Sequence, residues 1–114
     1  MLDFGLSDQT LATVRGILAA YPEVEKAILY GSRAMGNYRK GSDIDLTLVG
    51  DALNDRLLSS IAGRLEDSSI PYQVDLSLKE HIDNPNLLAH IERVGVLFYE
   101  KETGAATERA GKPL

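Results

Sequence analysis

Asp43 and Asp45 stand two residues apart in the segment DIDLTLV (43–49), whose side chains alternate between polar and apolar. This alternation predicts a strand that carries Ile44 and Leu46 on one face and both carboxylates on the other. Two carboxylates at this spacing repel each other, so either the pKa of one of them rises sharply or the pair binds a cation. Oxygen ligands favour a hard ion such as Mg²⁺. The pair therefore predicts a metal site.

A third aspartate has the same phase in its own segment. The residues YQVDLSL (72–78) also alternate, and Asp75 lies on their polar side. If this strand lies beside the strand at 43–49, Asp75 joins the first two acids on one face of the sheet. We therefore expect Asp43, Asp45 and Asp75 to converge. A lone Asp-x-Asp pair is more often a solvated polar face, so the metal interpretation depends on this third acid and on a phosphate site nearby.

Gly31 and Ser32 provide that phosphate site. They follow an apolar segment at 24–30 that predicts a buried strand, and they open a helical turn. Backbone N–H groups and a hydroxyl in this position can face a phosphate, and Arg33 adds a positive charge beside them. Metal ions held by carboxylates opposite a phosphate site stabilise the attacking and leaving oxygens of a displacement at phosphorus. The combination predicts nucleotidyl transfer.

The rest of the chain supplies elements that can position these groups. Ser or Asn caps followed by apolar residues at helical spacing predict helices over 7–21, 54–67 and 84–93, and a short helix or turn follows residue 33. Apolar or alternating runs predict strands over 24–30, 43–49, 72–78 and 96–100. The order alternates helix and strand from one end to the other, which indicates an α/β (α+β) fold with a sheet of about four strands.

Composition narrows the possible functions. The chain has 114 residues, which fits one domain, and 12 Lys and Arg against 17 Asp and Glu give a net charge of -5, which disfavours nucleic acid binding by charge. It has no cysteine, which excludes disulfides and thiolate metal sites. No apolar run approaches the roughly 18 residues of a membrane span, so we expect a cytoplasmic protein without a membrane segment.

The segment GSRAMGNYRKGSDIDL (31–46) carries a resemblance to a known family. Gly-Ser, ten residues and Asp-x-Asp are similar to the signature of the DNA polymerase beta-like nucleotidyltransferase superfamily. Residues 7–100 resemble its minimal nucleotidyltransferase (MNT) branch, which includes MntA-type antitoxins paired with HEPN toxins. The resemblance implies a mixed sheet flanked by helices and a domain over 1–100. Residues 101–114 have no apolar periodicity, which predicts a flexible tail. This sequence departs from the branch at Val94, where members often have an acidic residue. We attach no catalytic role to this position.

The resemblance also implies roles for single residues. Asp43 and Asp45 would bind two Mg²⁺ ions, and Asp75 would bind the catalytic ion and help to deprotonate the acceptor hydroxyl. Ser32, with the backbone of Gly31, would hold the β- and γ-phosphates of ATP, and Arg33 would reach the same phosphates. In this branch AMP passes from ATP to a tyrosine hydroxyl of the cognate HEPN toxin, which neutralises the toxin.

Two other functions stay open at this point. A dimer of the chain could build a pocket for a small-molecule acceptor, as in aminoglycoside-type nucleotidyltransferases, or the chain could inhibit a toxin by binding alone. Two histidines could in principle serve as metal ligands or bases, but His81 and His90 are nine residues apart, without an i, i+4 relation. We expect both to be surface or capping residues.

Overall fold

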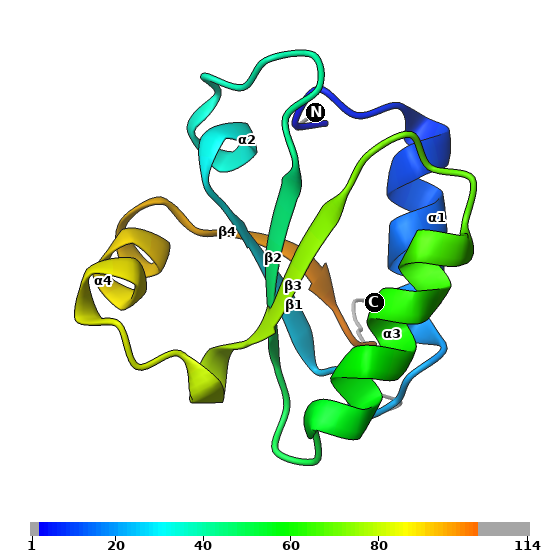
Figure 1. The fold of residues 1–114 in the computed structure, drawn as a ribbon, viewed down its shortest axis with the longest axis vertical. Coiled ribbons are helices and arrows are strands. Elements are labelled where there is room, and N and C mark those ends of the chain that lie inside the picture. Colours follow the sequence, from blue (N-terminus) through cyan, green and yellow to red (C-terminus); the bar gives the residue numbers. More distant parts are fainter. Residues whose placement is uncertain (1–2, 103–114) are drawn as a thin grey trace, which may run out of the picture.

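The computed structural model describes residues 3–102 of the chain. Helices and strands alternate along these residues (Figure 1). They are α1 (Asp8–Ala19), β1 (Lys26–Tyr30), α2 (Ser32–Met35), β2 (Ile44–Val49), α3 (Asp55–Asp67), β3 (Val74–Leu78), the 3₁₀ helix η1 (Lys79–His81), α4 (Pro85–Val94) and β4 (Val96–Glu100). The expected alternating order is confirmed, with η1 as an additional element. The tail predicted over 101–114 lies almost entirely outside the described residues.

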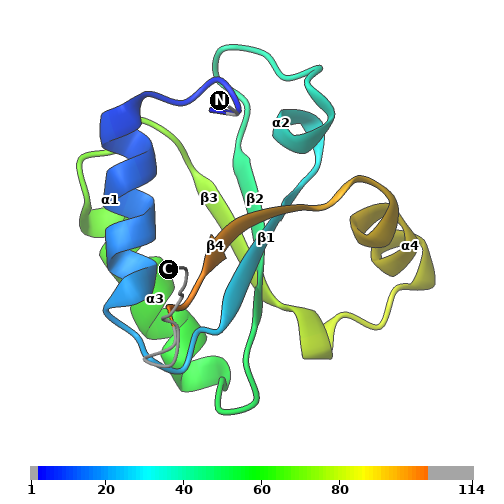
Figure 2. The ribbon, with the colours of Figure 1, turned by 180° about the vertical axis from the view of Figure 1, so that it is seen from behind.

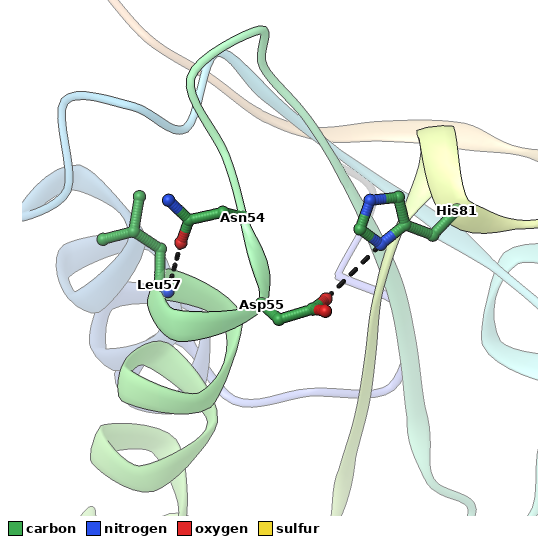
Figure 3. Close-up of polar contacts among 4 residues, drawn as sticks. All are labelled: Asn54, Asp55, Leu57 and His81. Atoms are coloured by element: carbon green, nitrogen blue, oxygen red, sulfur yellow. Dashed lines mark hydrogen bonds and ion pairs between the residues drawn. The ribbon is translucent and has the colours of Figure 1, made fainter.

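The longer helices begin at the expected caps. The Ser7 hydroxyl accepts a hydrogen bond from the Thr10 N–H at 3.1 Å, and Oδ1 of Asn54 accepts one from the Leu57 N–H at 2.9 Å (Figure 3). The Asn84 side chain caps α4 in the same way, with Pro85 in the first turn. Each cap satisfies a backbone donor that the helix itself leaves unpaired, and such a cap typically contributes about 1 kcal/mol.

The four strands form one mixed sheet in the order β3-β2-β1-β4. Strand β1 pairs antiparallel with both β2 and β4, whereas β2 and β3 run parallel. The parallel pair needs a crossover connection, and α3 supplies it. The pairing of β1 with β4 shifts register between Ala27 and Ile28. The expected mixed, four-stranded sheet is therefore confirmed.

The helices divide between the two sides of this sheet (Figures 1 and 2). Helices α1 and α3 lie together on one side, where they pack on each other, and α2 and α4 lie toward the other side beside β1. Alternate side chains of β2 point into the core under α1 and α3 and are almost completely buried, namely Ile44, Leu46 and Leu48. This burial fixes the strand's register, because a shift by one residue would put the acids into the core.

One polar contact joins η1 to the start of α3. Nδ1 of His81 in η1 lies 3.4 Å from Oδ1 of Asp55 at the start of α3 (Figure 3). Both side chains are exposed, and exposed pairs of this kind contribute little to stability. His81 is a surface residue, as expected. No helix among residues 3–102 is long and apolar enough to cross a membrane.

Candidate active site

The strand register places two of the three predicted acids side by side. Asp45 of β2 is the cross-strand partner of Asp75 on the parallel strand β3, and it is the partner of Tyr30 on β1. Directly opposed residues on neighbouring strands point to the same face. Since Ile44 and Leu46 face the core, Asp45 and Asp75 lie on the opposite face. Strands β2 and β3 are therefore neighbours, as the predicted meeting of Asp45 and Asp75 requires.

Asp43 occupies a different position from the one expected. The prediction put it inside a strand, but β2 begins at Ile44, so Asp43 is an exposed residue at the strand's entrance. The Ile44 N–H donates to the Gln73 carbonyl at 2.9 Å, which anchors the chain immediately after Asp43 to the segment that leads into β3. This anchor keeps Asp43 at the same edge of the sheet as the other two acids.

The acids influence one another electrostatically. Partial burial raises the pKa of Asp45 above its ordinary value, and the negative charges of Asp75 and then Asp43 raise it further. The charge interaction with His90 works in the opposite direction. Burial and like charges both disfavour the ionised form, so a bound cation would relieve both effects.

The arrangement fits Mg²⁺ as an ion shared with a substrate. Among residues 3–102, no group of three or more Asp, Glu, His or Cys side chains is assembled closely enough to hold a metal ion by itself. Mg²⁺ usually keeps several waters and binds one or two carboxylates together with substrate phosphates, so it does not require a complete protein cage. The raised pKa of Asp45 beside two more carboxylates is the feature that such an ion would suit.

Gly31 lies where the predicted phosphate-binding turn, Gly31–Ser32, comes close to the acids. Its backbone has φ 75° and ψ -156°, a conformation that is essentially restricted to glycine. A Cβ atom at this position would overlap Oδ2 of Asp45. The Asp45 carboxylate therefore lies against the Gly31 backbone, and Ser32 follows as the first residue of α2. The predicted turn at Gly31–Ser32 therefore lies beside one of the predicted acids, Asp45.

His90 belongs to this site, although the sequence analysis assigned it no role there. The Gly31 N–H donates a hydrogen bond to Nε2 of His90 at 3.2 Å, and the imidazole ring lies edge-on to Tyr30. The available signal was helical phase, because His90 falls three residues after Leu87 on the half-buried side of α4. Phase shows that a side chain points inward but does not identify its partner 59 residues away.

The Arg33 side chain is turned into the protein and bonded to backbone carbonyls. Its side chain is 2% exposed, and its guanidinium donates to the Ser42 carbonyl from Nε at 3.1 Å and from Nη2 at 2.9 Å. Nη1 donates to the Phe4 carbonyl at 2.8 Å. All three nitrogens of the guanidinium donate to backbone carbonyls, so the group holds segments of the backbone together. The expected contact between Arg33 and the phosphates is not supported by this arrangement.

The sequence profile of the polymerase beta nucleotidyltransferase family matches residues 12–104. The chain belongs to this family. The match includes Gly31, Ser32 and the three aspartates of this nucleotidyltransferase. No curated protein matches the sequence.

Solved structures share the nucleotidyltransferase fold. A toxin–antitoxin crystal structure with AMP-PNP aligns with a TM-score of 0.65 at 21% identity, covering 81% of this chain and 74% of the other. A complex of a tri-AMPylated Shewanella oneidensis HEPN toxin with its MNT antitoxin aligns with a TM-score of 0.60 at 19% identity, covering 82% and 71%. A candidate nucleotidyltransferase from Sulfolobus solfataricus aligns with a TM-score of 0.53 at 22% identity, covering 89% and 87%.

Proposed function

We propose that this chain is a Mg²⁺-dependent protein adenylyltransferase that transfers AMP from ATP to a tyrosine hydroxyl of a cognate HEPN toxin and so acts as an antitoxin. The observation that carries the proposal is the placement of Asp45 beside Asp75 on one face of the sheet and against the Gly31 backbone. Acids and phosphate turn are thereby adjacent, as transfer at phosphorus requires.

Each group then has a task. Asp43 and Asp45 would hold two Mg²⁺ ions together with Asp75, and these ions would supply charge stabilisation at the α-phosphorus of ATP. The Gly31 backbone and the Ser32 hydroxyl would hold the β- and γ-phosphates. Asp75 would accept the proton of the acceptor hydroxyl, and it is the more exposed member of its cross-strand pair. The hydroxyl oxygen forms a bond to the α-phosphorus, the bond to the β-phosphate oxygen breaks, and pyrophosphate leaves.

The choice of acceptor is supported by the structural neighbours. One is a toxin–antitoxin structure with AMP-PNP, and another contains a tri-AMPylated HEPN toxin with its MNT antitoxin. Both align over more than four-fifths of this chain. We therefore infer ATP as nucleotide, a HEPN-domain protein as partner and the cytoplasm, which holds ATP and Mg²⁺, as location. The domain proposed over 1–100 includes every residue assigned a role.

The test is a transfer assay on the full chain with a candidate cognate HEPN protein. Mg²⁺ is supplied with each of the four ribonucleoside triphosphates in turn, and mass spectrometry is applied to both intact proteins, to their peptides and to any added small molecule. The proposal predicts AMP on a tyrosine of the HEPN protein with ATP and Mg²⁺ present, and none when EDTA is added. AMP on an added small amine or alcohol without a HEPN protein would instead identify a small-molecule enzyme. Neutralisation of the toxin without any mass change would identify inhibition by binding alone.

A further inference from the structure

Arg33 links the turn at Gly31–Ser32 to the segment before Asp43 by bonding to a backbone carbonyl of that segment. It follows Ser32 directly, and its guanidinium binds the carbonyl of Ser42, the residue immediately before Asp43. The third bonded nitrogen reaches the Phe4 carbonyl in the turn before α1. One side chain thus ties the start of α2, the entrance of β2 and the N-terminal turn to one another.

Aromatic rings fix this guanidinium in place. Its central carbon lies 5.0 Å from the ring centroid of Tyr38 and 4.7 Å from that of Tyr72. Tyr38 in turn lies so close to Gly5 that a Cβ atom there would overlap the ring. A planar, delocalised cation can stack on rings while its edge donates several hydrogen bonds, whereas an ammonium is a compact point charge. Lysine therefore cannot reproduce this set of contacts.

The segment held by Arg33 is a closed turn. The Arg39 N–H donates to the Ser42 hydroxyl at 2.8 Å, and the Ser42 N–H donates to the Arg39 carbonyl at 3.0 Å. These bonds hold the turn together, and the Ser42 carbonyl belongs to the same planar peptide group as the Asp43 N–H, so a displacement of the carbonyl moves the Asp43 backbone as well. The bond from Arg33 is therefore the link that sets the position of this turn relative to α2.

We propose that Arg33 is a positioning residue that fixes the separation between the phosphate turn at Gly31–Ser32 and the Asp43 carboxylate. This inference rests on the proposed nucleotidyl transfer for its kinetic consequence. Small displacements of a reacting group can cost about 100-fold in rate, so loss of the link should act mainly on turnover. A phosphate-binding arginine would act mainly on nucleotide affinity.

The kinetic test compares Arg33→Met and Arg33→Lys with Arg15→Met. Arg15 is a matched control, because it also donates to a backbone carbonyl, that of Phe98 at 3.0 Å, and stacks on an aromatic ring, but it lies on α1 across the sheet from the acids. We expect both Arg33 variants to lose about 10- to 100-fold in kcat and to need more Mg²⁺ for half-maximal rate. The KM for ATP should change by less than about threefold, and Arg15→Met should keep its kcat.

Three results would overturn the inference. A KM for ATP that rises about tenfold at unchanged kcat would identify Arg33 as a phosphate ligand. Unchanged kinetics in both Arg33 variants would show that the link has no effect on the site. An equal loss of kcat in Arg15→Met would show that general destabilisation is responsible. If Arg33→Met does not fold, the comparison proceeds with Arg33→Lys, which keeps the charge.

A second measurement does not depend on activity. The Ile44 N–H donates to the Gln73 carbonyl outside the turn, so its amide hydrogen exchange reports whether the entrance of β2 is still held in place, even if the chain transfers no nucleotide. We expect the Ile44 amide to exchange at least about tenfold faster in the Arg33 variants than in the wild type, with no change in Arg15→Met. Unchanged exchange at Ile44 would refute the positioning role, whereas absent transfer by the wild type would refute only the proposed function.

Discussion

The backbone N–H of Gly31 donates a hydrogen bond to Nε2 of His90, at a distance of 3.2 Å. In the proposed reaction the same N–H faces a phosphate of the nucleotide. A donor with one hydrogen can serve one strong acceptor at a time, so His90 and a phosphate oxygen compete for it. In the proposed reaction this competition would couple helix α4 to nucleotide binding through a single hydrogen bond.

This competition predicts the effect of replacing His90. In His90→Phe the edge contact with Tyr30 is kept and the acceptor is lost, so the KM for ATP should fall by about two- to tenfold, the range of one net hydrogen bond. His90→Gln, which keeps an acceptor, is the matched control and should stay nearer the wild type. Steady-state kinetics with ATP measures both. A higher KM in His90→Phe would mean that the imidazole helps to bind the nucleotide.

Removal of a carboxylate should separate activity from stability. In Asp43→Asn or Asp45→Asn, transfer should fall by more than about 100-fold, because the ions lose a charged ligand. The melting temperature without Mg²⁺ should equal or exceed that of the wild type, because repulsion among the acids is reduced. Labelled-ATP transfer and thermal melts measure the two effects. Full transfer by both variants would remove the metal assignment.

The raised pKa of Asp45 predicts a pH dependence of stability. A carboxyl whose pKa is raised by folding destabilises the folded state once pH exceeds its unfolded value, and the penalty is complete above the folded value. The melting temperature of Asp45→Asn minus that of the wild type should therefore be smallest below the ordinary pKa of 3.8 and should grow as pH rises through the pKa of folded Asp45. Saturating Mg²⁺ with ATP should reduce this difference at neutral pH. A difference independent of pH would contradict the assigned burial and charge effects.

Gly31 should tolerate no side chain. In Gly31→Ala the backbone conformation should cost about 1–3 kcal/mol of the free energy of unfolding, and the new Cβ should displace the Asp45 carboxylate and abolish transfer. Gly36→Ala is the matched control, since Gly36 also has a positive φ of 85° but has open space at its Cβ position. Chemical denaturation and the transfer assay should show a stability loss in both variants and loss of transfer only in Gly31→Ala. Retained transfer in Gly31→Ala would contradict the close approach.

Local signals were sufficient for most of the fold. The caps at Ser7, Asn54 and Asn84 and the alternation around Asp45 and Asp75 reflect interactions within a few residues, so these elements could be predicted from the sequence. The order of the strands could not, because pairing depends on contacts between distant segments. The sequence predicts that Asp45 and Asp75 meet only if β2 and β3 are neighbours, and the structure shows that these two strands pair in parallel.

Arg33 and His90 show why the rest of the site was less predictable. A basic residue after Gly-Ser favours a phosphate interpretation, yet the Arg33 guanidinium binds carbonyls of Phe4 and Ser42, which lie 29 and 9 residues away. His90 meets Gly31 across 59 residues. Such side-chain contacts depend on how distant elements pack together. Neither the residue type nor its spacing in the sequence predicts the partner.

The most direct test of the central claim is the mass of the cognate HEPN protein, intact and as peptides, after incubation with this chain, ATP and Mg²⁺. The account predicts a mass gain of one or more AMP units on tyrosine, which disappears with Asp45→Asn or with EDTA. A HEPN protein that is neutralised at unchanged mass, with Asp45→Asn as effective as the wild type, would contradict it.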